Sequence, residues 1–410
     1  MKIDIFHSPA RIPLIVGIIA MALLVFIIVS SPAKLVYDEP YHIDLAKNVL
    51  SSGWYAALTS LQNQSAAGPL YPAVQAALSG LTGFQPPLIR WVNLLCLAMV
   101  IITLAKTYQR ELVSWDLIPA LSIISVPFLW PCVGMALTEL PALAVFTFYV
   151  FALMKVLRNP DLTIGSAAWA GIAGLALGVS ILGRQTYLVA LASVILLFII
   201  SPKKWAFWLL CLVVAIFSCG WLFILWGGLV PPSQHHVNSG IRLEYGLQSL
   251  GYVAAATFFL NPKWLKLETP RAVLSVVIMG IVLTWLAHDY SRPPSKTLLL
   301  KVLGTPCGLI VGFLFRGILT SVAIVWLRNT LVMAWNERGE PVRTFLYVTL
   351  FALVAAPMKV SHLFSSRYVV GLLGVLILVV GVPTASTYSL AMRIALGSIV
   401  GAATLYTYFY

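Results

Sequence analysis

The sequence predicts an all-α fold, a polytopic transmembrane helical bundle of about 13 spans, because apolar stretches of ~20 residues recur along its length. Of its 410 residues, 60% are hydrophobic and only 10% are charged, and the mean hydropathy is +0.95. A soluble domain of this size needs a more polar surface. The alternation of apolar and polar residues that marks a β-strand is not visible, which favours helices over a barrel.

The basic residues predict the direction in which each span crosses the bilayer, since Lys and Arg gather on the cytoplasmic side. Lys2 and Arg11 place the start of the chain in the cytoplasm. The first span is interpreted as a retained anchor. Residues 32–87 then form an external loop, in which 68–83 is a short surface-lying or re-entrant helix. The spans expected up to residue 229 are 12–30, 88–107, 116–131, 140–157, 164–182, 187–200 and 205–229. Between residues 247 and 335 the side of each loop is ambiguous. The basic run 336–343 is expected inside, which puts 359–367 outside.

The net charge of +13 comes from 26 basic and 13 acidic residues. In a membrane protein such an excess is expected at cytoplasmic helix ends and beside anionic lipid. Membrane lipids, and no nucleic acid, are therefore the partners that it indicates. The five cysteines lie within apolar stretches and have neither metal-ligand spacing nor a disulfide pattern, which argues against structural metal and redox roles.

Three of the 13 carboxylates lie in residues 36–44, directly after the first span. A carboxylate beside the bilayer is costly to hold charged, so this cluster indicates a use for Asp38 and Glu39. Adjacent side chains diverge, so one acid facing a cavity and one buttressing it is more plausible than a two-carboxylate dyad. A lone carboxylate in a partly dry pocket suits a general base. The alternative is that the acids only keep the loop out of the membrane.

Two further polar groups fall on the external side by topology alone, Thr138-Glu139 and Arg184-Gln185. The first either caps the helix that follows or shapes the site. Arg184 stands at an external helix end, against the charge bias. It either forms a salt bridge with Glu139 or Asp38, or clamps a phosphate, for which a guanidinium is well suited.

A second basic group on this side comprises Lys359, His362 and Arg367, which could also grip a phosphate leaving group. The pair His235-His236 is a weak signal for a metal, because paired histidines in a loop are more often solvated. We therefore expect no metal ligands and no required cofactor, with a divalent ion as the alternative.

An outward base, a phosphate clamp and a membrane-embedded cavity together suggest a lipid-phosphate donor. A polyprenyl tail would partition into the bilayer while its phosphate waits at the interface. Glycosyl transfer from it needs deprotonation of the acceptor hydroxyl and stabilisation of the departing phosphate. This step requires no nucleotide, in agreement with the lack of a P-loop in the sequence.

Five short motifs resemble the GT-C superfamily of polyprenyl-phosphate-sugar glycosyltransferases. They are Asp38-Glu39-Pro40-Tyr41-His42-Ile43, Leu58-Thr59-Ser60, Gly68-Pro69-Leu70-Tyr71, Thr138-Glu139 and Gly183-Arg184-Gln185-Thr186. Their order and spacing are most similar to the dolichyl-phosphoglucose alpha-1,2-glucosyltransferase branch. The resemblance covers roughly the first half of the chain. Tyr187 stands where that branch has an asparagine, and the second half matches only at Arg367-Tyr368.

The resemblance implies a GT-C-like fold with external juxtamembrane helices and an inverting transfer of one sugar, glucose or another hexose. Residues 1–246 would form the catalytic transmembrane module, with the external loop 32–87, and residues 247–410 a variable C-terminal module. Asp38 would be the base, Arg184 would contact the donor phosphate and Glu139 would support the site. With the reasoning above, the expected site comprises the catalytic Asp38 and Glu39, the phosphate ligands Arg184, Lys359 and Arg367, and the supporting His42, Glu139, Gln185 and Tyr71.

The donor would be a polyprenyl-phosphate-linked sugar, and the acceptor a lipid, a glycan or a protein. The site would face the external or lumenal side of a plasma (inner) or endoplasmic reticulum membrane. The main alternative is a polytopic transporter or a lipid-linked-sugar flippase. Transporters usually place ionisable groups at mid-membrane and show repeat symmetry. Here the polar residues collect at one face and no repeat is visible, which favours an enzyme.

Overall fold

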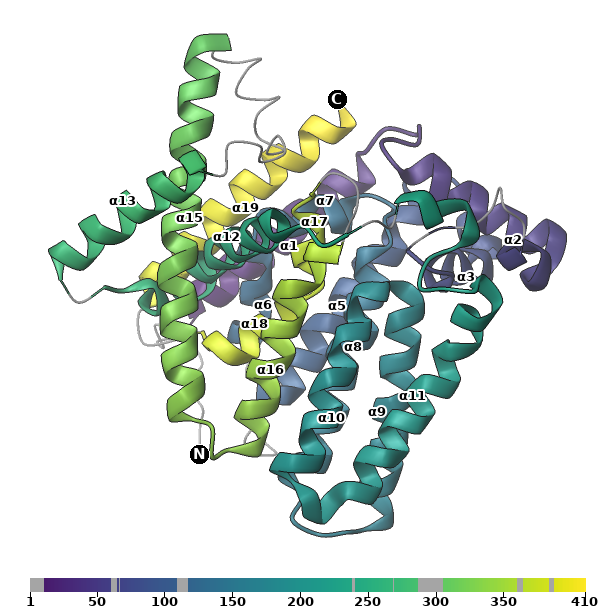
Figure 1. The fold of residues 1–410 in the computed structure, drawn as a ribbon. Coiled ribbons are helices and arrows are strands. Elements are labelled where there is room, and N and C mark those ends of the chain that lie inside the picture. The colour runs from purple at the N-terminus through teal and green to yellow at the C-terminus, as the bar shows by residue number, and fades with distance from the viewer. Residues whose placement is uncertain are drawn as a thin grey trace, which may run out of the picture.

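The structure, a computed structural model, describes residues 11–59, 65, 67–108, 117–237, 240–267, 269–286, 305–359, 364–382 and 387–410. Every regular element in these ranges is a helix (Figure 1). The predicted all-α bundle is therefore confirmed. His362, Ser60 and the Arg292–Lys296 region lie outside the described residues, as do the side chains of His235 and His236.

Eight stretches of helix in the described ranges are long and apolar enough to cross a membrane. This supports an integral membrane protein, while the count of about 13 spans is not confirmed. The helices that carry these stretches are α1 (Arg11–Val29), α5 (Leu88–Tyr108), α8 (Glu139–Arg158), α9 (Ile164–Gly183), α11 (Trp205–Trp226), α15 (Thr305–Asn336), α16 (Pro341–Ala355) with the 3₁₀ turn η7 (Ala356–Lys359), and α19 (Thr387–Phe409).

Two expected spans are shorter helices instead. Residues 116–131 were expected to cross once, but the described part is divided into α6 (Leu117–Leu121), η2 (Ser122–Ser125) and α7 (Leu129–Gly134). Pro127 lies in the break between η2 and α7, while Pro119 and Pro131 lie in the first turns of α6 and α7, where proline is tolerated. The expected span 187–200 is the 3₁₀ helix η3 (Gln185–Ala190) followed by α10 (Leu191–Ile200).

Helices α8, α9 and α11 stand side by side, with α9 between the other two (Figure 1). Small residues on α9 permit this approach. A Cβ atom at Gly174 would collide with the carbonyl oxygen of Cys211, and one at Gly178 would lie 2.8 Å from that of Ala215. These close contacts set the position of α9 against α11, and with it the position of the last turn of α9.

The described helices at the two ends of the chain, α1 and α19, pack against each other. Helix α19 also lies on η2 and α7, where a Cβ atom at Gly397 would collide with the carbonyl oxygen of Ser125. The end of α19 thereby reaches the segment that follows α1.

The described part of the segment expected as external loop 32–87 contains three helices at one edge of the molecule (Figure 1). They are α2 (Glu39–Thr59), which is interrupted at Gly53 with a φ of 77°, α3 (Leu70–Ala77) and α4 (Ser79–Thr82). The remaining helices are α12 (Leu243–Leu260), α13 (Pro270–Leu286), α17 (Arg367–Val370), α18 (Leu373–Val380), η4 (Pro202–Lys204), η5 (Pro232–Val237) and η6 (Pro262–Leu265).

The main hydrophobic core runs from Ala20 to Phe409 and draws on both of the expected modules. The pocket described below also takes residues from both. The division at residue 246 stays a prediction.

Candidate active site

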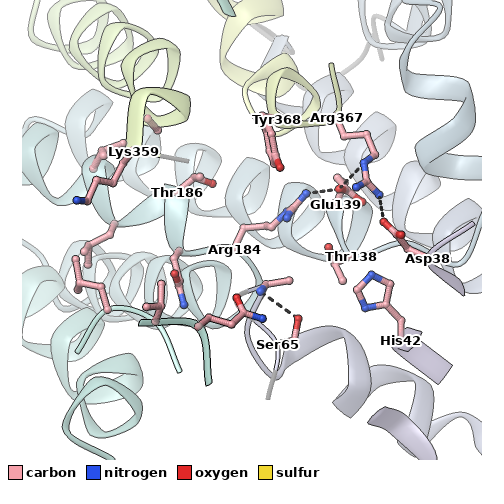
Figure 2. Close-up of a pocket in the computed structure, with 18 of the residues that line it drawn as sticks. Asp38, His42, Ser65, Thr138, Glu139, Arg184, Thr186, Lys359, Arg367 and Tyr368 are labelled. Carbon is pink, nitrogen blue, oxygen red and sulfur yellow. Dashed lines mark hydrogen bonds and ion pairs between the residues drawn. The ribbon is translucent and has the colours of Figure 1, made fainter. Parts of the chain in front are cut away.

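A pocket of about 460 Å³ lies where the ends of several helices meet (Figure 2). Its charged lining residues come from segments far apart in the sequence: Asp38, Glu139, Arg184, Lys359 and Arg367. His42 and Gln185 also line it. Seven of the nine expected site residues thus meet in one cavity, and the other two, Glu39 and Tyr71, lie outside it.

A chain of charges crosses the pocket from Asp38 to Arg184. Arg367 Nη1 lies 3.0 Å from Asp38 Oδ2, and Arg367 Nε lies 3.8 Å from Glu139 Oε1. Arg184 Nη2 donates a hydrogen bond to the same Glu139 oxygen. Arg184 therefore does form one of the two salt bridges expected for it.

Helix ends place Glu139 and Arg184 opposite each other. Glu139 is the first residue of α8, where the helix dipole favours a carboxylate, and it is only 3% exposed. The expected cap is not seen, because the Thr138 side chain makes no capping bond. Arg184 follows the last residue of α9 with extended backbone. A Cβ atom at Gly68 would collide with the carbonyl oxygen of Leu182, so the backbone before α3 packs directly against the end of α9, next to Arg184.

Glu39 is the acid that faces away from the pocket, contrary to the expectation that it is catalytic. Its side chain has no exposed surface, and Arg90 Nε and Nη2 each donate to it over 2.8 Å. The backbone N–H groups of Val36 and Ala136 also donate to it, both over 2.8 Å. These four protein donors occupy the lone pairs of the Glu39 carboxylate, so it has none left for a substrate. Glu39 can therefore affect a reaction only by holding its neighbour Asp38 in position.

Sequence reasoning missed Arg90, which is fully buried near the start of α5. Besides Glu39, its guanidinium donates to Ser31 Oγ, at 2.5 Å, and to the carbonyl oxygens of Pro32 and Lys34, both at 3.0 Å. It thereby holds the segment between α1 and α2 in place. The signal that could have found it was an arginine inside an apolar span, which requires a partner.

Tyr71 is buried behind the pocket rather than in its lining. Gln75 Nε2 donates to its hydroxyl over 2.8 Å, and its ring packs edge-on against His42 with centroids 5.7 Å apart. Its contact with the site is therefore indirect, through the His42 ring. His42 itself lines the pocket and is 6% exposed.

Burial lowers the pKa of His42 from 6.5 to about 4, although the nearby Glu139 and Asp38 oppose this shift. The imidazole is therefore neutral at physiological pH. Arg184 and Arg367 act in the same direction as burial.

This shift makes stability depend on pH. The folded pKa of His42 lies below its unfolded value, so the unfolded chain binds more protons and stability falls as the pH drops from 6.5 to about 4. We expect His42→Gln to remove the part of the stability loss that comes from His42, which reaches about 3 kcal/mol near the lower end of this pH range. Thermal unfolding in detergent at a series of pH values measures it. Parallel curves for the variant and the wild type would contradict the assignment.

Lys359 lies on the opposite side of the pocket from Asp38, with Arg184 between them (Figure 2). Its ammonium donates to the carbonyl oxygen of Gly240 over 3.5 Å. The guanidinium carbon of Arg184 lies 5.7 Å from the centre of the Tyr368 ring, a cation–π arrangement that keeps the charge near the pocket.

The pocket carries a net positive charge, because its lining has the three cations Arg184, Lys359 and Arg367 against two carboxylates. With His42 neutral, the sum is +3 − 2 = +1. A further part of the lining is apolar, with Leu188, Val189, Leu229 and Val230. The cavity is thus suited to an amphipathic anion. Among the described residues, no group of three His, Cys, Asp or Glu side chains could hold a metal ion.

Comparisons with known proteins find a weak similarity between nearly the whole chain and two solved structures. No family model and no curated protein matches the sequence. The crystal structure of ArnT from Cupriavidus metallidurans in the apo state is similar at 12% identity and a TM-score of 0.47, covering 97% of this chain and 77% of that one. ArnT bound to undecaprenyl phosphate is similar at 16% identity and a TM-score of 0.46, covering 96% and 76%. At these scores neither site nor activity follows from the likeness.

Proposed function

We propose that the chain is a membrane glycosyltransferase that moves one sugar from a polyprenyl-phosphate donor to an acceptor hydroxyl. The observation that supports this most directly is the pocket in which Asp38, Glu139, Arg184, Lys359 and Arg367 meet, with an excess of one positive charge. The apolar part of the lining suits the first isoprene units, and the cations suit the phosphate.

Asp38 is the general base in this proposal. Its side chain is 42% exposed and lines the pocket, so an acceptor hydroxyl can reach it. Arg184, Lys359 and Arg367 bind the donor phosphate and stabilise the charge that grows on it as the glycosidic bond breaks. Glu139 orients Arg184 and Arg367, and His42 and Gln185 complete the walls. A single displacement by the activated acceptor inverts the anomeric centre.

The sugar, the acceptor and the side of the membrane are proposed from the sequence. We propose glucose or another hexose as the sugar, as in the dolichyl-phosphoglucose branch, and a lipid, glycan or protein as the acceptor. The site would face the external or lumenal side of a plasma or endoplasmic reticulum membrane. The proposed reaction requires no cofactor.

The test is consumption of a panel of polyprenyl-phosphate sugars by the purified protein, with glycosyl transfer followed by mass spectrometry. Release of polyprenyl phosphate from one donor supports the proposal and names the sugar. Movement of intact donor across proteoliposomes without any release would replace the proposal with a flippase.

Arg184→Ala is expected to weaken donor binding by about 10- to 100-fold, because a hydrogen bond to a charged group contributes roughly 1.5–3 kcal/mol. The dissociation constant of undecaprenyl phosphate, measured in detergent, checks this. Arg338→Ala is the control, since Arg338 is exposed and its guanidinium lies over Trp335, outside the pocket. Equal affinities of both variants would exclude Arg184 from the phosphate site.

A further inference from the structure

Three aromatic residues at the C-terminal end of the chain contact the surroundings of the two adjacent acids. The Tyr408 ring packs edge-on against Tyr37, with centroids 5.4 Å apart at 72°. The Phe409 ring centre lies 4.6 Å from the guanidinium carbon of Arg90. The Tyr410 hydroxyl donates to the carbonyl oxygen of Ser30 over 3.3 Å.

Tyr37 lies between α19 and the charge chain of the pocket. One side of it meets Tyr408, while the Arg367 guanidinium carbon lies 5.1 Å from its ring centre. The same guanidinium pairs with Asp38 over 3.0 Å. A continuous path of contacts therefore runs from Tyr408 through Tyr37 and Arg367 to the carboxylate of Asp38.

The backbone of Tyr37 is left-handed, with a φ of 54°. For a residue with a bulky side chain this conformation is strained and persists only where the surroundings impose it. The next turn is closed by the Glu39 N–H, which donates to the carbonyl oxygen of Val36 over 3.0 Å. The conformation of Tyr37 thus sets the direction in which Asp38 leaves the backbone.

We infer that Tyr408 is a positioning residue, which holds Tyr37 in its left-handed conformation and so keeps Arg367 and Asp38 in reacting geometry. An edge-on aromatic pair is attractive beyond its buried area, which offsets part of the strain at Tyr37. Tyr408 is itself 39% exposed, so its loss leaves little cavity in the core. Its effect is therefore on geometry more than on stability. The inference rests on the proposed role of Asp38.

The experiment compares Tyr408→Ala, Tyr408→Phe and Tyr388→Ala in the donor-consumption assay. Tyr388 is 69% exposed and lies at the opposite end of the same helix from Tyr408. Tyr408→Ala should lower kcat about tenfold, as small misplacements of reacting groups do, while the dissociation constant for undecaprenyl phosphate stays within about twofold. Tyr408→Phe keeps the ring and should restore kcat, and Tyr388→Ala should match the wild type.

A double-mutant cycle separates positioning from a general loss of structure. If Tyr408 acts through Tyr37, the kcat losses of Tyr408→Ala and Tyr37→Ala should be strongly non-additive, because the two rings share one contact. Additive losses, an unchanged kcat in Tyr408→Ala, or a Phe variant as impaired as the Ala variant would each overturn the inference. The Asp38→Asn variant, measured in parallel, distinguishes failure of this inference from failure of the proposed function. Full activity of Asp38→Asn would show that Asp38 is not the base, whatever Tyr408 does.

Discussion

Asp38→Asn is expected to abolish turnover while leaving donor binding largely intact. The amide has the size of the carboxylate but cannot accept the proton of an acceptor hydroxyl, and a general base contributes typically about 10²–10⁴-fold in rate. The three cations of the pocket are untouched, and Arg367 loses one of its two anionic partners. Phosphate affinity should therefore be unchanged or slightly higher. Single-turnover transfer and undecaprenyl phosphate binding, measured on the same preparation, check both parts.

Asp44→Asn is the matched control, because Asp44 lies on α2, which begins directly after Asp38, and its exposed carboxylate lies 3.7 Å from the exposed Lys47 ammonium, outside the pocket. It should turn over as the wild type does. Normal turnover by Asp38→Asn would exclude Asp38 as the base. Loss of activity together with loss of binding would instead show that the substitution disturbs the phosphate site.

Arg90→Met is expected to give the largest loss of stability, about 3–5 kcal/mol, because it leaves a carboxylate buried without its partner. Neither Arg90 nor Glu39 has any exposed side-chain surface, and the pair is joined by two hydrogen bonds of 2.8 Å. The same change frees the carbonyl groups of Pro32 and Lys34 from their donor. Thermal unfolding in detergent, followed by loss of the monodisperse fraction, measures the effect.

Arg343→Met provides the comparison. Arg343 pairs with Glu337 at 3.6 Å, but their side chains are 36% and 28% exposed, so the loss should be no more than about 1 kcal/mol. Adding Glu39→Gln to Arg90→Met removes the unpaired charge and should recover part of the stability. Equal losses from the buried and the exposed pair would contradict the role given to Arg90.

Hydropathy predicted the helical bundle because most of the spans are long and uninterrupted. It failed for the expected span 116–131, whose described part, 117–131, is divided into shorter helices and mostly buried inside the protein. An apolar stretch has the same hydropathy whether lipid or protein covers it, so hydropathy alone does not distinguish a membrane span from a buried, divided segment.

Charge bias along the chain was enough to predict that Asp38, Glu139 and Arg184 lie on one side, and the structure places all three in one pocket. Which of two adjacent acids would face that pocket was not predictable, because it depends on a partner, Arg90, that is 51 residues from Glu39. The ion pair of Asp38 with Arg367 is likewise a long-range contact without a local signal.

The packing of α1 against α19 has a consequence for how the protein is made. Chains are synthesised from the N-terminus, and the early segments fold first. Asp38 emerges soon after α1, whereas Arg367 and Tyr408 are added hundreds of residues later. Until α17 has been made, Asp38 lacks Arg367 beside it, and until the end of α19 has been made, Tyr37 lacks the Tyr408 ring. The pocket therefore acquires Arg367 and Tyr368 late in synthesis, and the contact of Tyr37 with Tyr408 forms only after all the residues that line the pocket have been made.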